Sequence, residues 1–266
     1  MGSYSIKIVD NAVRVIHLQT RFTSSMGFSV HIPHIEGVLF DSGYPHARGV
    51  LLEALRGLSV ERVVNTHSHE DHLGNNFHLQ RELGSRLYAP AASLSIAKKP
   101  PRIPLFRRAI WGTPDPCHPE ALPEIIVTGK FQFRAIPTPG HIDDMVAFHE
   151  AERGWVIGGD LYLGDRIRVG ATWENGKHWI ASLERVLALK PRIFFCYHRG
   201  AILKPQEALG RKLDFLRTIE RKARDMRAQG LSIHEISHRL LGREKYLLKL
   251  LSAGEFSKMN LIRSFL

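Results

Sequence analysis

Short alternations of hydrophobic and polar residues fill the first forty positions of the chain. The stretches SIKIVD, VRVIHLQ, FSVHI and GVLFDSG are rich in β-branched or aromatic residues and are separated by turn residues, which predicts strands. In residues 45–58 the apolar positions change to helical spacing, and RVVNTH then predicts a short buried strand at 62–67. Residues 73–83 again have helical spacing. The pattern therefore predicts strands first, followed by strand–helix alternation.

The middle of the chain continues this alternation. A strand is predicted at 86–90 and a short helix at 91–99. The proline-rich residues 98–128 have no clear periodicity, so we expect a long irregular segment, which in a compact domain is more often functional than incidental. The strands KFQFRAIPT, MVAFHE and GWVIGGD follow, and a helix at 178–189 precedes the strand RIFFCYH.

From about residue 205 the pattern is helical only. Residues 205–229 predict one long amphipathic helix that Gly230 ends, and Ser232 with Glu235 forms a capping box for the next helix. Residues 255–266 predict another helix. This order of elements favours an α/β fold in which two mixed β-sheets pack face to face with helices outside. We expect one domain at residues 1–203 and a helical C-terminal extension at 204–266.

The composition is that of an ordinary globular protein. The 266 residues are 44% hydrophobic and 24% charged, and no run approaches the roughly 18 apolar residues of a membrane-spanning helix. The N-terminus lacks the pattern of a secretory signal. Cys117 and Cys196 make no disulfide framework and fit a reducing cytosol. We therefore expect a cytoplasmic protein without a membrane span.

The formal charge of +11 is spread unevenly. Residues 201–266 contain 14 Lys and Arg and 7 Asp and Glu, which gives this part of the chain a net charge of +7. A second basic stretch is KKPPRIPLFRR at 98–108. A positive field suits an anionic small molecule, a nucleic acid or an acidic lipid surface. The charge alone does not distinguish among these three kinds of partner, and a well-solvated basic surface without a partner is the simple alternative.

One loop concentrates metal-binding side chains within six positions. The stretch NTHSHEDHLGN contains H-x-H-x-D-H, formed by His67, His69, Asp71 and His72. Imidazoles and a carboxylate suit Zn²⁺, and they are also compatible with Mn²⁺ or Fe²⁺. These four groups cannot all bind one ion with good geometry, so two adjacent divalent ions explain the crowding better.

Three further donors follow predicted strands. His141 lies in PTPGHIDD, Asp160 ends GWVIGGD, and His198 ends RIFFCYH. Side chains at the C-terminal ends of strands can converge at one edge of a sheet, which scattered histidines would not do. The competing interpretation for each of the three is a capping or surface residue.

The motifs THSHEDHLGN, PTPGH, GGD and YH, in this order, resemble those of the metallo-β-lactamase-fold superfamily, the αββα sandwich hydrolases. The resemblance covers residues 1 to about 203. It implies a first metal held by His67, His69 and His141, a second held by Asp71, His72 and His198, and Asp160 as the bridge between them. It also implies that Asp41, in LFDSG, orients the site from behind the ligands.

Two adjacent metal ions can hold a hydroxide, polarise a carbonyl or phosphoryl group and stabilise the developing oxyanion. We therefore expect a hydrolase in which Asp71 is essential for catalysis. Within the family, true metallo-β-lactamases carry cysteine or serine at the position of Asp160. A bridging aspartate is typical of glyoxalase II-like thioesterases, lactonases and nucleases. The glutathione-binding motifs of glyoxalase II are not visible, so the expected substrate is a small ester, thioester or lactone.

Five residues are candidates for contact with the substrate. The positive charges could attract an anionic substrate, and the phenols could assist the oxyanion; a solvated basic loop and packed aromatic rings are the competing interpretations. The candidates are Arg102, Arg107, Arg108, Tyr162 and Tyr197.

Two other functions remain open at this point. The basic charge would suit a metal-dependent nuclease or phosphodiesterase that acts on RNA or DNA. A non-catalytic, metal-stabilised binding protein is the third alternative, although a complete ligand set argues against it. The C-terminal helices could form a lid, the interface of a homodimer or a nucleic-acid-binding surface.

Overall fold

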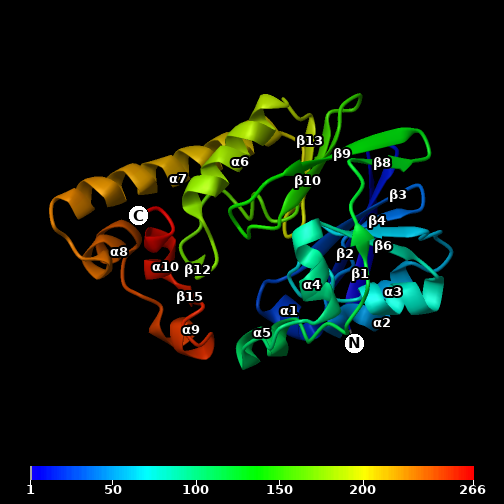
Figure 1. Cartoon of the computed structure of the whole chain (residues 1–266), viewed down its shortest axis with the longest axis horizontal. Helices are drawn as coiled ribbons and strands as arrows, with labels where there is room; N and C mark the ends of the chain where they lie inside the picture. Colours follow the sequence, from blue (N-terminus) through cyan, green and yellow to red (C-terminus); the bar gives the residue numbers. More distant parts are fainter. Residues whose placement is uncertain (1) are drawn as a thin grey trace.

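Two β-sheets pack face to face, with helices on their outer surfaces (Figure 1). The computed structural model describes residues 2–266. One hydrophobic core lies between the sheets and joins, among others, Phe40 of the first sheet to Phe133 and Phe148 of the second. A second core lies under the helices of the first sheet, and a third lies between the second sheet and the C-terminal helices. The predicted αββα architecture is therefore confirmed.

The first sheet has the strand order β1-β2-β3-β4-β5-β6-β7. The strands β1 to β4 pair antiparallel, and β4 to β7 pair parallel. Their bounds are β1 Ser3–Val9, β2 Val13–Gln19, β3 Val30–Ile35, β4 Val38–Phe40, β5 Arg62–Val64, β6 Arg86–Ala89 and β7 Glu120–Ala121. The parallel part brings the C-terminal ends of β4 and β5 side by side, and the metal-binding motif follows β5 directly.

The second sheet has the order β14-β13-β11-β10-β9-β8. Only β11 and β13 pair parallel, so the segments that follow these two strands leave the sheet at the same edge. The bounds are β8 Ile125–Thr128, β9 Phe131–Pro137, β10 Val146–Glu150, β11 Trp155–Ile157, β13 Ile193–Cys196 and β14 Gly200–Ile202. The residues after β9, β11 and β13 carry the three later candidate ligands.

The helices cover both outer faces (Figure 1). Those of the N-terminal half are α1 Arg21–Ser25, η1 Pro45–Ala47, α2 Arg48–Ala54, α3 Asn76–Leu83, η2 Ala91–Ser93, α4 Leu94–Lys98 and α5 Leu105–Ile110. Those of the C-terminal half are α6 Gly176–Ala188, α7 Pro205–Ala228, α8 Ile233–Leu241, α9 Tyr246–Leu251 and α10 Lys258–Arg263. The predicted capping box of Ser232 and Glu235 is present at the start of α8.

The proline-rich segment is more structured than its sequence indicates. We expected residues 98–128 to be irregular, but they contain α5, β7 and β8. These elements are six, two and four residues long, and such short elements leave no detectable periodicity. For the same reason α9 and the small sheet formed by β12 Gly170–Ala171 and β15 Phe256–Ser257 are not visible in the sequence pattern.

The C-terminal extension is tied to the rest of the chain at two places. The helix α7 packs along α6, and α8 and α10 pack against α7. The strand β15 Phe256–Ser257 pairs antiparallel with β12 Gly170–Ala171, which lies between β11 and α6 in the sequence. The helix α7 begins two residues after the boundary that we expected at 203, while the division into two domains stays a prediction. Among residues 2–266, no helix combines the length and the apolar character needed to cross a bilayer.

Lys212 of α7 is a buried charge that should lower the stability of the fold. Its side chain is fully buried 4.3 Å from the ring centroid of Trp179, and its Nζ atom has no hydrogen-bond partner among the described residues. Burial lowers the pKa of Lys212 from 10.5 to about 7. The unfolded chain therefore binds more protons between pH 7 and 10.5, and stability should rise with pH across this window.

We expect Lys212→Met to raise the free energy of unfolding at pH 7 by on the order of 2 kcal/mol, because an apolar side chain avoids the desolvation of the ammonium group. The gain should shrink as the pH approaches 10, where the native lysine is already neutral. Urea unfolding at both pH values tests this, with the exposed Lys222→Met on the same helix as the control. A gain that does not change with pH would contradict the explanation.

Candidate metal centre

Asp41 anchors the loop that carries the H-x-H-x-D-H motif. Its Oδ1 accepts a hydrogen bond from the backbone N–H of Thr66 at 2.7 Å, and its Oδ2 accepts one from the Thr66 hydroxyl at 2.9 Å. The same Oδ2 lies 2.8 Å from Nδ1 of His72. Asp41 is buried and holds a left-handed backbone conformation with φ +68°, which costs energy for a residue with a side chain. The strained aspartate thus fixes the loop from the end of the neighbouring strand β4.

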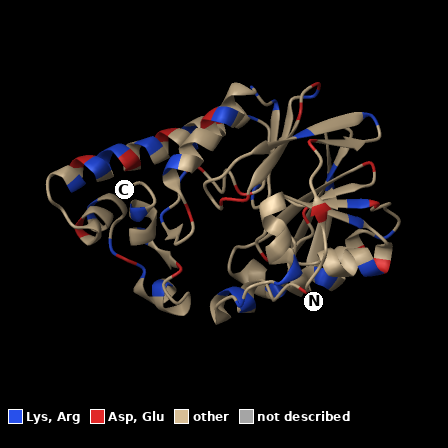
Figure 2. Ribbon diagram, in the orientation of Figure 1, with Lys and Arg blue, Asp and Glu red and all other residues tan. Residues whose placement is uncertain are grey.

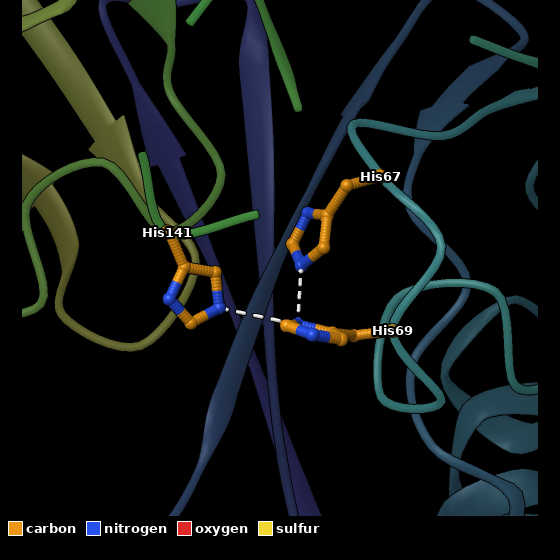
Figure 3. Close-up of side chains that lie close together, drawn as sticks. All are labelled: His67, His69 and His141. Carbon is orange, nitrogen blue, oxygen red and sulfur yellow. Dashed lines mark hydrogen bonds between the residues drawn. The ribbon is translucent and has the colours of Figure 1, made fainter. Parts of the chain in front are cut away.

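Three imidazoles from two loops point toward one another (Figure 3). Nε2 of His67 lies 3.0 Å from Nδ1 of His69, and Nε2 of His141 lies 3.1 Å from the same atom. Nitrogen ligands about 2.0–2.1 Å from one tetrahedral ion lie roughly 3.3 Å apart, so this spacing suits a shared ion. The structure therefore brings together the three histidines that the family resemblance assigned to the first metal.

A second group lies beside the first. Nε2 of His198 is 3.2 Å from Oδ2 of Asp71, and Nε2 of His72 is 3.8 Å from the same oxygen. These three residues form a second set of donor atoms close enough for one ion. They come from the motif loop and from the segment after β13, which meet at the same edge of the two sheets.

Asp160 lies between the two groups. Its Oδ2 is 3.4 Å from Nε2 of His141 and 3.3 Å from Nε2 of His198, while its Oδ1 is 3.5 Å from Nε2 of His72. One carboxylate thus faces donors of both sets, which is the placement that a bridging ligand requires. His67, His72 and Asp160 form a third group whose ligand atoms all lie within 4.8 Å of one another, so the two donor sets adjoin each other.

Two orphaned atoms show that the donor set fits cations. Nε2 of His72 and Oδ1 of Asp160 are buried without a hydrogen-bond partner among the described residues. Buried polar atoms are normally paired, because leaving them unpaired costs free energy. Their neighbours are other imidazole and carboxylate donors, so bound divalent ions would satisfy them. Neutral imidazoles with carboxylates form the donor chemistry of Zn²⁺, Mn²⁺ or Fe²⁺.

The pKa values divide the histidines into two kinds. Burial, followed by the neighbouring imidazoles, lowers the pKa of His67 and of His69 well below the usual value, so both are neutral and can donate lone pairs. Burial also lowers the pKa of His72, but Asp41, Asp160 and Asp71 outweigh it and raise the value to about 10. His72 therefore lies in the more negative half of the site, where positive charge is favoured.

A pocket of about 380 Å³ opens over these donors. Five of the seven predicted ligands line it, and most of the remaining wall is apolar or aromatic, with Arg107 and Arg199 as its cations. The lining ligands are His69, Asp71, His141, Asp160 and His198. The apolar and aromatic lining includes Phe28, Ile110, Trp111, Leu163, Val169, Trp173, Leu248 and Phe256. The pocket therefore admits a small molecule with an apolar part next to the candidate ions.

The family model of the metallo-beta-lactamase superfamily matches residues 36–214, which is more than half of the chain and includes all seven candidate ligands. The chain belongs to this superfamily. The resemblance inferred from the sequence motifs is thereby confirmed.

Individual relatives agree with this assignment. A hydroxyacylglutathione hydrolase of Thiobacillus denitrificans is 28% identical over 187 residues, covering 69% of this chain and 61% of that protein. A beta-lactamase domain protein from Burkholderia ambifaria has a TM-score of 0.70 at 18% identity, covering 97% of this chain and 87% of that one. The structure of TTHA1623 in a di-iron-bound form has a TM-score of 0.55 at 26% identity, covering 68% of this chain and 92% of that one. The matches to the Drosophila melanogaster beta-lactamase-like protein 2 homolog and to the hydroxyacylglutathione hydrolases span about half to two thirds of the lengths of those proteins.

Acceptors behind the ligands orient the imidazoles of this metallo-beta-lactamase superfamily site. Nδ1 of His141 lies 3.1 Å from Oε1 of Glu174, and Nδ1 of His198 lies 3.0 Å from the backbone oxygen of Ser29. With Asp41 behind His72, each of these Nδ1 atoms faces an acceptor, which places its proton there and leaves Nε2 free as a ligand atom. The sequence pointed to Asp41 but gave no signal for Glu174 or Ser29, because neither lies in a motif.

Replacing Glu174 should weaken metal binding without unfolding the protein. We expect Glu174→Gln to lower the affinity for the ion held by His141 about tenfold or more, because the amide holds the imidazole less strongly than the carboxylate does. Competition with a chromogenic chelator measures this. Glu184→Gln on the exposed face of α6 is the matched control. Equal affinity in the two variants would show that Glu174 does not tune the site.

Arg107 links three parts of the structure. Its guanidinium donates to both carboxylate oxygens of Glu70, within the motif loop, at 2.8 and 2.5 Å. It also lies 3.5 Å from Glu255 of the C-terminal extension and stacks 4.7 Å above the ring of Trp173. Burial raises the pKa of Glu70, and Arg107 opposes that shift. Arg107 therefore lines the pocket, but its charge is already engaged by carboxylates of the chain.

The structure does not bring the other four substrate candidates to the pocket wall. Arg102 and Arg108 are exposed outside it. The hydroxyl of Tyr197 donates to the backbone oxygen of Asp71 at 2.5 Å, and its ring stacks on His72, so this tyrosine supports the motif loop. The hydroxyl of Tyr162 is bonded to Asp165. Arg199, which the sequence analysis missed, is the exposed cation of the lining, and only its position directly after His198 could have indicated it.

Proposed function

We propose that the protein is a dinuclear metal-dependent hydrolase that acts on a small ester, thioester or lactone. The observation that carries this proposal is the convergence of two donor sets on Asp160 beneath a small, largely apolar pocket. His67, His69 and His141 would hold the first ion, Asp71, His72 and His198 the second, and Asp160 both. Membership in the superfamily and the hydroxyacylglutathione hydrolases among the relatives support hydrolysis.

The residues of the chain have separate tasks in this reaction. Two divalent ions held here would supply a nucleophile at neutral pH and polarise the carbonyl oxygen of the substrate. Asp41, Glu174 and the Ser29 carbonyl keep a proton on Nδ1 of the histidine that each one faces. The apolar walls exclude water from the acyl group, and Arg199 offers a charge to an anionic part of the substrate.

We propose zinc as the ion, with iron or manganese as compatible alternatives. The histidine and aspartate donors suit all three metals. TTHA1623, which was solved in a di-iron-bound form, supports iron as the first alternative. Metal analysis of protein purified without chelators decides among them. A cytoplasmic location remains part of the same proposal.

The surface charges favour a small molecule over a nucleic acid. Figure 2 shows positive and negative residues side by side along α7, which holds half of the Lys and Arg residues of the C-terminal extension. Several of these arginines form ion pairs, which reduces the field that a phosphate backbone would meet. The pairs are Arg211–Asp165, Arg217–Glu184, Arg221–Asp225 and Arg224–Glu220. Cleavage of RNA or DNA is therefore the second hypothesis.

The decisive experiment is a substrate panel with zinc-loaded protein: an aryl ester, an acyl thioester, a lactone, a phosphodiester and a labelled single-stranded RNA. We expect chelator-sensitive cleavage of one or more carbonyl substrates, with the RNA intact. Cleavage of RNA with all carbonyl substrates untouched would replace the proposal by the nuclease hypothesis. Full metal content without turnover of any substrate would support a binding protein instead.

A further inference from the structure

Exposed apolar side chains gather around the mouth of the pocket. They come from α1 and the residues after it, from α5 and from α9, three segments that also contribute pocket-lining residues or their direct neighbours. Figure 1 shows these helices along one side of the molecule. We call this set the apolar rim: Phe22, Met26, Phe28, Leu105, Tyr246, Leu247, Leu250 and Leu251.

Several large apolar side chains of the rim are mostly exposed to solvent. Leu105, Leu247 and Leu250 are 76%, 71% and 77% exposed, and α9 has no buried residue at all. Single exposed leucines need no explanation, but a cluster of large apolar side chains on a soluble fold marks a surface that contacts something else. The helix α9, with the sequence YLLKLL, therefore contributes no buried side chain to a hydrophobic core, and Leu247, Leu250 and Leu251 are exposed.

Basic residues flank the apolar rim. Residues 98–111, around α5, contain no acidic residue, and α9 begins directly after Lys245 and contains Lys249 (Figure 2). Glu244, the acid nearest α9 in sequence, accepts backbone N–H groups of Lys258 and Met259. None of the flanking cations forms an ion pair with a residue in the described range 2–266; they are Lys98, Lys99, Arg102, Arg108, Lys245 and Lys249.

We propose that the apolar rim docks the pocket mouth onto an anionic lipid surface. Leucines and aromatic rings would enter the boundary between headgroups and acyl chains, and the flanking cations would face the acidic headgroups, as in interfacial helices. A symmetric contact with a second copy fits less well, because it would bring the same unpaired cations opposite one another. In the docked state the pocket opens toward the lipid, from which it can take an apolar ligand.

Sedimentation with vesicles tests the proposal independently of catalysis. The probes are vesicles of phosphatidylglycerol mixed with phosphatidylcholine, and vesicles of phosphatidylcholine alone. We expect the protein to bind the acidic vesicles, and Leu247→Ser/Leu250→Ser to lower the bound fraction by on the order of tenfold. Leu203→Ser removes a leucine that is 65% exposed outside the rim and is the matched control. Circular dichroism confirms that each variant is folded.

A second pair of variants tests the charges. Lys98→Gln/Lys99→Gln/Lys245→Gln should reduce binding, and Lys7→Gln/Lys130→Gln/Lys222→Gln, with the same loss of net charge elsewhere, should not. The proposal is overturned if the unaltered protein does not bind acidic vesicles, or if it binds phosphatidylcholine vesicles as strongly as it binds acidic ones. It is also overturned if light scattering finds a dimer that Leu247→Ser/Leu250→Ser dissociates, because the rim would then be an interface between copies.

Discussion

Asp71→Ala should lower kcat/KM by at least about 10³-fold, because it removes a donor from one ion and costs several kcal/mol of transition-state stabilisation. The fold should survive, since the ion-pair partners of the Asp71 carboxylate among residues 2–266 are Nε2 of His198 and of His72, while Tyr197 donates its hydrogen bond to the Asp71 backbone. Turnover of the best substrate from the panel and the thermal midpoint, measured on the same preparation, check both statements.

The metal content of Asp71→Ala shows whether the loss of activity comes from the loss of one ion. The variant should retain the ion of the three-histidine set and lose most of the other, since His72 and His198 remain without the carboxylate. Asp143→Ala, which removes an 85% exposed carboxylate next to the same loops, is the control and should keep full activity. Undiminished turnover by Asp71→Ala with both ions bound would disprove the proposed mechanism.

Arg107→Met should destabilise the protein by roughly 3 kcal/mol, because it leaves the carboxylate of Glu70 buried without its partner. The side chains of Arg107 and Glu70 are 12% and 4% exposed, and the pair is bidentate, so water does not replace the lost contact easily. The stacking on Trp173 and the contact with Glu255 are lost as well. Urea unfolding of the two proteins measures the difference.

A double-mutant cycle separates the ion pair from simple loss of packing. Glu70→Gln/Arg107→Met removes both charges, and it should recover most of the stability that Arg107→Met loses. Arg86→Met, at an exposed pair with Glu120, should change stability by less than about 0.5 kcal/mol. If the double variant is as unstable as Arg107→Met, the packing of the Arg107 side chain matters more than its charge.

The ligand positions could be predicted from the sequence because local rules fix them. His67 to His72 lie on one tight turn after β5, and His141, Asp160 and His198 each follow a strand of the second sheet. Strand ends at one edge of a face-to-face sandwich lie close together, so a correct list of strands was enough to expect their convergence. The expected role of Asp41 came from the family resemblance, and the structure places Asp41 directly after β4, next to β5 in the parallel part of the sheet.

The supporting residues could not be predicted, because long-range packing determines them. Glu174 lies 33 positions after His141, and Arg107 lies 37 positions after Glu70. Glu174 lies in the segment after β12, which pairs with β15, and Arg107 lies on α5, so each pair joins segments that are distant in the sequence. A glutamate or an arginine in an unpatterned segment looks like any solvated charge, and for that reason the sequence indicated Arg107 as a substrate contact rather than as the partner of Glu70.

Because β12 pairs with β15 near the C-terminus, metal binding during translation should depend on how much of the chain has been synthesised. Glu174 follows β12 by three residues, and α10 packs so closely on Gly170 that an added methyl group would meet the Leu261 backbone. A nascent chain that ends before residue 256 already contains every candidate ligand, but it lacks the strand that holds the Glu174 loop. Metal loading during translation should therefore be incomplete until residues 256–263 have left the ribosome, and a stalled chain of 250 residues should lose its ions to a weak chelator.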